Sequence, residues 1–266
     1  MQTIDEIIHD PVSRRAFLRR MTAAGLGTAA TVLLATQPGA LWAGGSSGGD
    51  PNFPGIPGRN IDEIVLNFAL TLENLEADLY RQALNKATGR PRNAQLLPFR
   101  DRDDYELEVD AGDLTDQAAE DGFLFLVEFT YVEAAHRDFL TAAIKAGGGT
   151  PVPPNSKGYQ FATPLKDNLE SILSHILPLE ETGVRAYLGA LPFLDNYKVF
   201  GPTAGGIFST EARHSAVISN VLGIDPGPRK MPGDQQVTPN QPSENTFEYF
   251  LAPKVVIQRV QPMIIK

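Results

Sequence analysis

The chain has 266 residues, a formal net charge of −9 and no cysteine. The lack of cysteine excludes disulfides, thiolate zinc sites, iron–sulfur clusters and cysteine nucleophiles. The negative charge argues against nucleic acid as a partner, because a phosphate backbone binds to surfaces rich in Lys and Arg. With 42% hydrophobic and 21% charged residues, the composition is that of an ordinary globular protein.

The N-terminal segment resembles a bacterial twin-arginine export signal. Arg14 and Arg15 lie in the sequence SRRAFLR, and an apolar stretch follows at 23–35. That stretch is shorter than the roughly 20 residues of a membrane-spanning helix. We therefore expect residues 1–43 to be a signal peptide that directs the protein, through the twin-arginine machinery, to the periplasm or the extracellular space. The resemblance implies that the protein folds, and takes up a cofactor or metal, inside the cell before export. A basic surface helix is the alternative, and cleavage after Ala43 or retention as an anchor both stay open.

Beyond this segment, four stretches show the apolar spacing that is typical of amphipathic helices. We expect helices at about 61–87 with Asn60 as N-cap, 116–146 after Thr115, 165–191 interrupted by Pro178, and 204–222 ending at Gly223. The links at 88–114, 147–164 and 192–203 are irregular, and the second has the length of a crossover. Four such helices predict an all-α fold, an antiparallel four-helix bundle with long links.

The remaining segments flank this bundle. Residues 44–59 are rich in Gly, Ser and Pro, which predicts a flexible linker. The bundle is expected to occupy residues 60–224. Residues 225–266 form a Pro-rich C-terminal arm, which we expect to be an extended tail or one or two short strands.

Each predicted helix interrupts its own apolar face with ionisable side chains. The faces are Leu66, Ala69, Glu73, Glu76, Tyr80 and Leu84; Leu126, Phe129, Glu133, His136, Leu140 and Ala143; Leu169, Leu173, Ile176, Glu180, Val184 and Tyr187; and Ile207, Glu211, His214, Ile218 and Val221. No Lys or Arg shares these faces. A buried, unpaired carboxylate costs several kcal/mol, so four of them require positive charge. Two divalent cations would neutralise four glutamates, and two neutral imidazoles would complete the ligand set.

The spacing of the acids and histidines supports this interpretation. Glu133 and His136, and likewise Glu211 and His214, are three residues apart, which places both side chains of a pair on one side of a helix. A single Glu-x-x-His is weak evidence, whereas two of them on apolar faces are not expected from composition. The candidate metal ligands are therefore Glu133, His136, Glu211 and His214, with one further glutamate from each of the other two helices: Glu73 or Glu76 from the first, and Glu180 from the third.

Other assignments stay open at this point. Glu76 shares the face of Glu73 and competes with it as a ligand. Glu181 points about 100° away from Glu180, Glu128 is expected to be solvated or to lie outside the ligand set, and His175 is expected to be a surface or hydrogen-bonded histidine. A bundle that no longer binds metal, held by Glu–His hydrogen bonds, is the alternative for the whole pattern.

This arrangement resembles the ferritin-like di-iron and di-manganese carboxylate proteins. The closest likeness is to bacterial ferritin-like domain proteins that are similar to plant desiccation-related proteins, and it lies in LNFALTLENLEADLY and LEETGVRAYLGAL. The resemblance covers residues 60–223. It implies that Glu133 and Glu211 bridge two metals, that Glu73 and Glu180 bind one each, that each histidine binds one, and that Tyr80 lies just outside the ligands.

The resemblance implies a redox-active centre of two iron or manganese ions that acts on dioxygen or peroxide in stress protection. The alternative is a non-enzymatic metal-binding or structural scaffold related to stress or desiccation. A homo-oligomer is compatible with either function. A storage cage is less consistent with the long links and tail, and zinc hydrolysis is disfavoured because His-Glu-x-x-His is absent.

Overall fold

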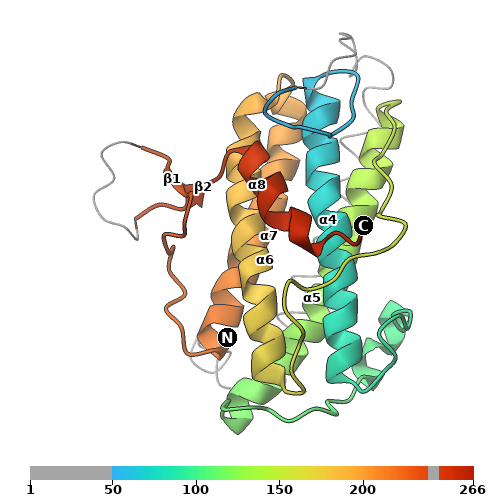
Figure 1. Ribbon diagram of the computed structural model, residues 1–266, viewed down its shortest axis with the longest axis vertical. Coiled ribbons are helices and arrows are strands. Elements are labelled where there is room, and N and C mark those ends of the chain that lie inside the picture. The colour runs from blue at the N-terminus through green and yellow to red at the C-terminus, as the bar shows by residue number, and fades with distance from the viewer. Residues whose placement is uncertain (1–49, 239–245) are drawn as a thin grey trace, which may run out of the picture.

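The computed structural model describes residues 50–238 and 246–266. The expected twin-arginine signal and its cleavage site lie outside these residues. Four long helices run side by side along the longest axis of the molecule (Figure 1). Among the described residues, no helix has both the length and the hydropathy needed to span a membrane.

The predicted all-α bundle is confirmed. Its four helices are α4 (Ile61–Ala87), α5 (Asp116–Ala146), α6 (Leu169–Ala190) and α7 (Tyr197–Val221). Helix α4 packs mainly against α5, and α6 packs mainly against α7. In Figure 1, both pairs are antiparallel, while α5 and α6 run in the same direction and are joined by a crossover along the bundle. The link between α4 and α5 contains the 3-10 helix η1 (Phe99–Asp104).

The first two helices begin and end where the sequence predicts. The side chain of Asn60 accepts a hydrogen bond from Glu63 N, and the side chain of Thr115 accepts one from Ala118 N. Each cap satisfies a backbone donor that the first turn leaves free.

The other two helices differ from the prediction at their starts. Helix α6 begins four residues later than expected, because the side chain of Asn168 caps Ser171 N. Its helical structure continues through Pro178, which was expected to break it. Helix α7 begins at Tyr197 rather than near 204, and it includes Pro202. The apolar side chain of Phe200 is buried in the core, and this burial offsets the cost of a proline within the helix.

Polar side chains of α4 hold the crossover in place. Asn67 donates to Thr150 O and accepts from Val152 N, at 3.1 and 2.8 Å. Further along α4, Gln82 donates to Tyr159 O. The crossover therefore covers the polar side of α4, which explains why polar residues of this helix are buried as well as its apolar ones.

The C-terminal arm is folded against the bundle, which corrects the expectation that its last residues are extended or form strands. It contains the short pair β1 (Gln235–Gln236) and β2 (Tyr249–Phe250), the helix α8 (Pro253–Val260) and the 3-10 helix η3 (Gln261–Met263). Helix α8 and strand β2 both pack against α6. Gly189 of α6 permits this contact, because a Cβ there would clash with the carbonyl oxygen of Leu251.

A buried ion network fastens the arm to α6. Arg185 is 0% exposed and donates to Glu181 at 2.5 Å and to both oxygens of Asp234 at 2.8 Å. Glu181 also accepts from Ser215 Oγ at 2.5 Å and lies 3.5 Å from Arg229. We call these five residues the Arg185 cluster. Its two arginines and two acids balance one another in charge.

The chain before α4 also packs onto the body. Phe53 is fully buried, and its ring makes edge contacts with Phe68 and Phe193 at centroid distances of 5.3 and 5.1 Å. The described part of the expected linker, from residue 50 onward, therefore contributes to the hydrophobic core. Its Gly and Pro content suggested a free segment, but a single buried aromatic side chain is enough to anchor it.

Candidate metal centre

The structure brings all six predicted ligands together in the middle of the bundle. Each of the four helices contributes one glutamate, and α5 and α7 add one histidine each. We call the set the Glu–His cluster; its members are Glu73, Glu133, His136, Glu180, Glu211 and His214. The four glutamates are at most 1% exposed and His214 is 3% exposed. Only the side chain of His136, 14% exposed, reaches the surface.

The ligand atoms form two groups that share two residues. The first group contains Glu73, Glu133, His136 and Glu211, and the second contains Glu133, Glu180, Glu211 and His214. Within each group, the candidate ligand atoms all lie within 4.8 Å of one another. Each group therefore has three carboxylates and one imidazole, and the glutamates of α5 and α7 belong to both.

In the first group, the atoms surround His136. Its Nδ1 lies 3.2 Å from Glu133 Oε2, 3.3 Å from Glu211 Oε1 and 3.6 Å from Glu73 Oε2. Glu133 and His136 lie on successive turns of α5, so one helix supplies two of the four side chains.

In the second group, the atoms surround His214. Its Nδ1 lies 2.9 Å from Glu133 Oε1 and 3.4 Å from Glu180 Oε2. The two oxygens of Glu133 thus face different histidines, as a bridging carboxylate would. The ring of Phe129 stacks on the His214 ring at a centroid distance of 3.8 Å and fixes its plane.

Two tyrosines orient the glutamates that belong to one group only. Tyr187 of α6 donates to Glu73 of α4 at 2.6 Å, and Tyr80 of α4 donates to Glu180 of α6. The position of Tyr80 next to the predicted ligands agrees with the family resemblance, whereas the role of Tyr187 was not anticipated. The signal was present in the sequence, because Glu180 precedes Tyr187 by seven residues just as Glu73 precedes Tyr80.

Several polar atoms of the cluster are buried without a hydrogen-bond partner. They are Glu73 Oε2, Glu133 Oε1, Glu180 Oε2, both carboxylate oxygens of Glu211, and His214 Nδ1. Each unsatisfied buried group costs about 1–3 kcal/mol, and more when it is charged. These atoms belong to the two four-residue groups, so a cation in each group would satisfy them. The donor set therefore fits metal ions.

The pKa values of the acids indicate that ionised carboxylates in the cluster need positive charge beside them. Burial raises the pKa of Glu211 well above its ordinary value, and the neighbouring carboxylates of Glu133 and Glu180 raise it further. Burial also acts to raise the pKa of Glu133, but its contacts with His136 and His214 lower it to about 2. Without a metal, the cluster is stable only with protons on some of its members.

The histidines share those protons with Glu211, because the pKa of both imidazoles is raised as well. Burial acts to lower the pKa of both, but the acids around them outweigh it. Glu133 and Glu73 raise the pKa of His136 well above its ordinary value. Glu180 and Glu133 raise the pKa of His214 to about 9. A metal ion would replace these protons and turn both imidazoles into neutral ligands.

Glu76 is buried beside the cluster but belongs to neither group. Its Oε2 has no hydrogen-bond partner, and its pKa is raised well above the ordinary value by burial and by Glu73. The space between Glu76 and Glu211 exists because residue 183 is glycine; a Cβ there would lie 3.0 Å from Glu211 Oε2 and 3.3 Å from Glu76 Oε1. Grouping thus favours Glu73 over Glu76 as a ligand.

Two other acids and His175 are engaged elsewhere. Glu181 belongs to the Arg185 cluster. Glu128 is buried and pairs with Arg102 at 3.0 Å, so it is not solvated, although it does lie outside the ligand set. His175 is within hydrogen-bond distance of Thr163 Oγ1 and Ser171 O, as expected for a satisfied histidine.

Comparison with known proteins bears on the same part of the chain. Residues 61–224 match the family model of the ferritin-like domain. No curated protein matches the chain. The matched segment begins with α4 and ends just after α7, so it contains every residue of the Glu–His cluster.

Proposed function

This chain belongs to the ferritin-like family, and from that premise we propose that its Glu–His cluster holds two iron or manganese ions that react with dioxygen or peroxide. The observation that carries the proposal is the pair of four-residue groups sharing Glu133 and Glu211. In this assignment the shared glutamates would contribute to both metal sites. Glu73 and His136 complete one site, and Glu180 and His214 complete the other.

The donors favour these metals by their chemistry. Carboxylate oxygens with a minority of imidazole nitrogens suit iron and manganese, and thiolates are absent from the chain. A bound pair of such ions would supply electrons to dioxygen or peroxide, or accept them from peroxide. Four glutamates and two divalent ions sum to zero charge, which removes the cost of burying the acids.

The surroundings favour a small reactant. The glutamates and His214 are sealed inside the bundle, while the side chain of His136 is 14% exposed. Dioxygen and peroxide are small enough to enter beside one partly exposed ring. Tyr80 and Tyr187 hold Glu180 and Glu73 in place. The same depth of burial suits the alternative function, a stress- or desiccation-related scaffold in which the metals only stabilise the bundle.

We extend the proposal to the location of the protein. The twin-arginine resemblance of residues 1–43 supports export to the periplasm or the extracellular space, where an oxidant-consuming protein would act in protection. Residues 60–224 would then form the metal-binding domain, with residues 225–266 as an arm fastened to it.

Two measurements test the proposal. Metal analysis of the full chain, purified without chelator, should find two iron or manganese ions per chain. Consumption of dioxygen or peroxide is then compared between the wild type and a variant with Glu211→Ala and His214→Ala. Turnover that the variant loses supports the redox function. Full metal loading without turnover in the wild type supports the scaffold, and an unloaded wild type that cannot be loaded contradicts both.

A further inference from the structure

The Arg185 cluster forms a chain of contacts from the C-terminal arm to the middle of the bundle. At the arm, both oxygens of Asp234 accept from Arg185 Nε at 2.8 Å, and the carbonyl oxygen of Arg229 accepts from the same guanidinium. Arg185 also donates to Glu181 Oε2 at 2.5 Å, and Glu181 Oε1 accepts from Ser215 Oγ at 2.5 Å. The chain thus begins on the arm, crosses α6 and ends on α7.

The inner end of this chain lies beside two candidate ligands of the second group. Glu181 directly follows Glu180 on α6, and Ser215 directly follows His214 on α7. The hydrogen bond between Glu181 and Ser215 joins the two helices. One residue back on each helix, Glu180 Oε2 lies 3.4 Å from His214 Nδ1. A shift of α6 against α7 would therefore change both contacts together.

The turn of α6 that carries Glu180 has little support from its own backbone. Pro178 lies two residues before Glu180 and Gly183 lies three residues after it. The proline lacks the N–H that would donate to the carbonyl of Ser174, and glycine has a low helix propensity. The helix is nevertheless continuous through this turn. Contacts of neighbouring side chains, those of Glu181 among them, supply the support that the backbone lacks.

The support is asymmetric between the two groups of ligands. The members of the Arg185 cluster lie on α6, on α7 and on the arm, and the arm itself packs against α6. Glu73 and His136, which belong to the first group only, lie on α4 and α5. We therefore expect the arm to influence the second group more than the first.

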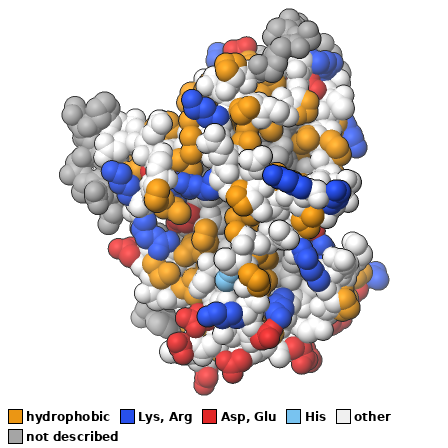
Figure 2. Space-filling model, viewed as in Figure 1, with side chains coloured by type: hydrophobic (Ala, Val, Ile, Leu, Met, Phe, Trp, Pro, Cys, Tyr) orange, Lys and Arg blue, Asp and Glu red, His pale blue; other side chains and the backbone are white. Residues whose placement is uncertain are grey.

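The chain of contacts is complete only while the arm is docked. Figure 2 shows acidic side chains gathered in solvent at the lower end of the molecule, where they need no counter-ion. The side chain of Asp234 is instead 0% exposed, and its burial is favourable only beside Arg185. Without the arm, Arg185 would be open to water, and its attraction to Glu181 would fall with the higher dielectric constant.

We propose that docking of the C-terminal arm, acting through the Arg185 cluster, sets the metal affinity of the second group. The members of the cluster are then positioning residues for Glu180 and His214. This inference rests on the proposed function, because it requires metal in the Glu–His cluster. By thermodynamic linkage the effect runs in both directions, so metal in the second group stabilises the docked arm by the same factor.

The first test titrates Mn²⁺ under nitrogen into the full chain and follows binding by calorimetry. Asp234→Asn should weaken one of the two binding events about five-fold or more and change the other less than about two-fold. In a Glu180→Gln background, which lacks a ligand of the second group, Asp234→Asn should change the remaining event less than about two-fold. In a Glu73→Gln background the five-fold effect should persist. The reverse pattern, or equal weakening of both events, would overturn the proposal.

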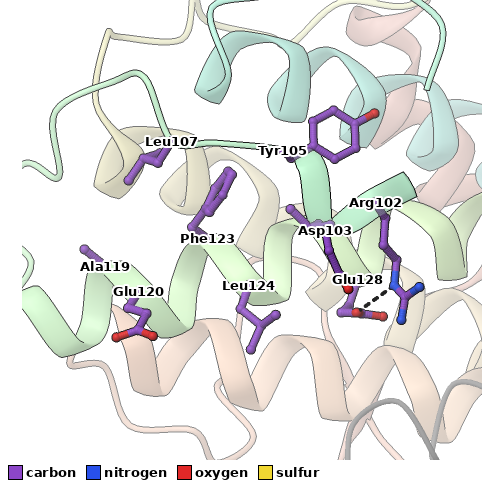
Figure 3. Close-up of a pocket in the computed structure, with 10 residues that line it drawn as sticks. Arg102, Asp103, Tyr105, Leu107, Ala119, Glu120, Phe123, Leu124 and Glu128 are labelled. Atoms are coloured by element: carbon purple, nitrogen blue, oxygen red, sulfur yellow. Dashed lines mark hydrogen bonds and ion pairs between the residues drawn. The ribbon is translucent and has the colours of Figure 1, made fainter. Parts of the chain in front are cut away.

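A matched control separates this coupling from a general loss of stability. Glu128 forms a second buried ion pair, with Arg102 of the link at 3.0 Å (Figure 3). Glu128→Gln therefore also removes a buried acid from an arginine, but at a place outside the Arg185 cluster. Both Mn²⁺ binding events should stay within about two-fold of the wild type. A loss equal to that in Asp234→Asn would mean that any weakened ion pair lowers metal affinity.

The second test needs no variant of the arm. Leu251 N donates to Arg185 O at 3.2 Å, so amide hydrogen exchange of Leu251 reports docking. Loading the wild type with Mn²⁺ should slow this exchange about five-fold or more, and loading Glu180→Gln should slow it less than about two-fold. Unchanged exchange in wild type with two bound ions would overturn the coupling alone. A wild type that takes up neither Mn²⁺ nor Fe²⁺ would overturn the proposed function, and this inference with it.

Discussion

This bundle contains two neighbouring groups of buried acids, and their negative charge is compensated in different ways. In the Arg185 cluster, Glu181 and Asp234 pair with two arginines, and every contact closes within the chain. In the Glu–His cluster, four glutamates face two histidines, and no Lys or Arg pairs with those glutamates in the described part of the chain. Glu180 and Glu181 are neighbours in sequence, as are His214 and Ser215, yet the members of each pair belong to different clusters.

The difference shows how a structural acid can be distinguished from a candidate metal ligand. A carboxylate with an arginine partner is part of the fold, and its burial needs no further explanation. A carboxylate buried with free oxygens beside other such carboxylates indicates a candidate cation site. The predictions below disturb one cluster at a time, from the largest expected effect to the smallest.

The largest effect should follow the loss of a shared ligand. Glu133→Ala removes a residue common to both groups, so we expect the bound metal to fall from two ions per chain to nearly none. If each site is filled a thousand-fold above its Kd, the loss of both ions costs about 8 kcal/mol of stability. Metal analysis and thermal unfolding measure the two consequences.

Glu76→Gln is the matched control for this change. It also removes a buried acid of the central region, but one that lies outside both groups. Metal content should stay near two ions per chain. A loss of metal in Glu76→Gln with retention in Glu73→Gln would mean that the first helix supplies Glu76 as its ligand instead.

The next effect concerns the Arg185 cluster. Arg185→Met leaves Glu181 and Asp234 buried without their counter-ion, which should destabilise the protein by about 3–5 kcal/mol. Urea unfolding of the metal-free protein measures this cost independently of metal binding. The exposed Arg213→Met serves as the control and should change stability by less than about 0.5 kcal/mol.

A triple variant sharpens the same prediction. Adding Glu181→Gln and Asp234→Asn to Arg185→Met removes the uncompensated charges, so the triple variant should be more stable than the single one. If the triple variant is the less stable of the two, packing rather than charge accounts for the role of Arg185.

A smaller and pH-dependent effect should distinguish metal-free from metal-loaded protein. The pKa of His214 is raised from 6.5 to about 9, so its protonation stabilises the metal-free fold fully below pH 6.5 and is lost as the pH rises to 9. The raised pKa of Glu211 acts in the same direction above its unfolded value of 4.5. Metal-free stability should therefore fall between pH 6.5 and 9. In loaded protein, ions replace the protons, so stability should hold or rise over this range. Parallel profiles would contradict this account.

The sequence predicted the bundle and the cluster because both depend on local spacing. The apolar faces repeat every three or four residues, and an acid on such a face is visible without coordinates. The partners of Arg185 were not predictable in this way, since Asp234 lies 49 residues further along the chain. Helix α8 was missed because its valines and isoleucine are equally typical of strands, and contact with α6 decides between the two.

The smallest effect should come from Tyr80 and Tyr187, which hydrogen-bond to candidate ligands but are not ligands themselves. Tyr187→Phe removes the hydrogen bond to Glu73 and keeps the ring in the core, so we expect a loss of about 1 kcal/mol and weaker metal binding in the first group only. Tyr80→Phe should weaken the second group instead, because Tyr80 donates to Glu180. Stepwise metal titration of the two variants separates the sites. If both variants weaken the same binding step, the tyrosines do not act through the glutamates they contact, and the two halves of the centre are not independent.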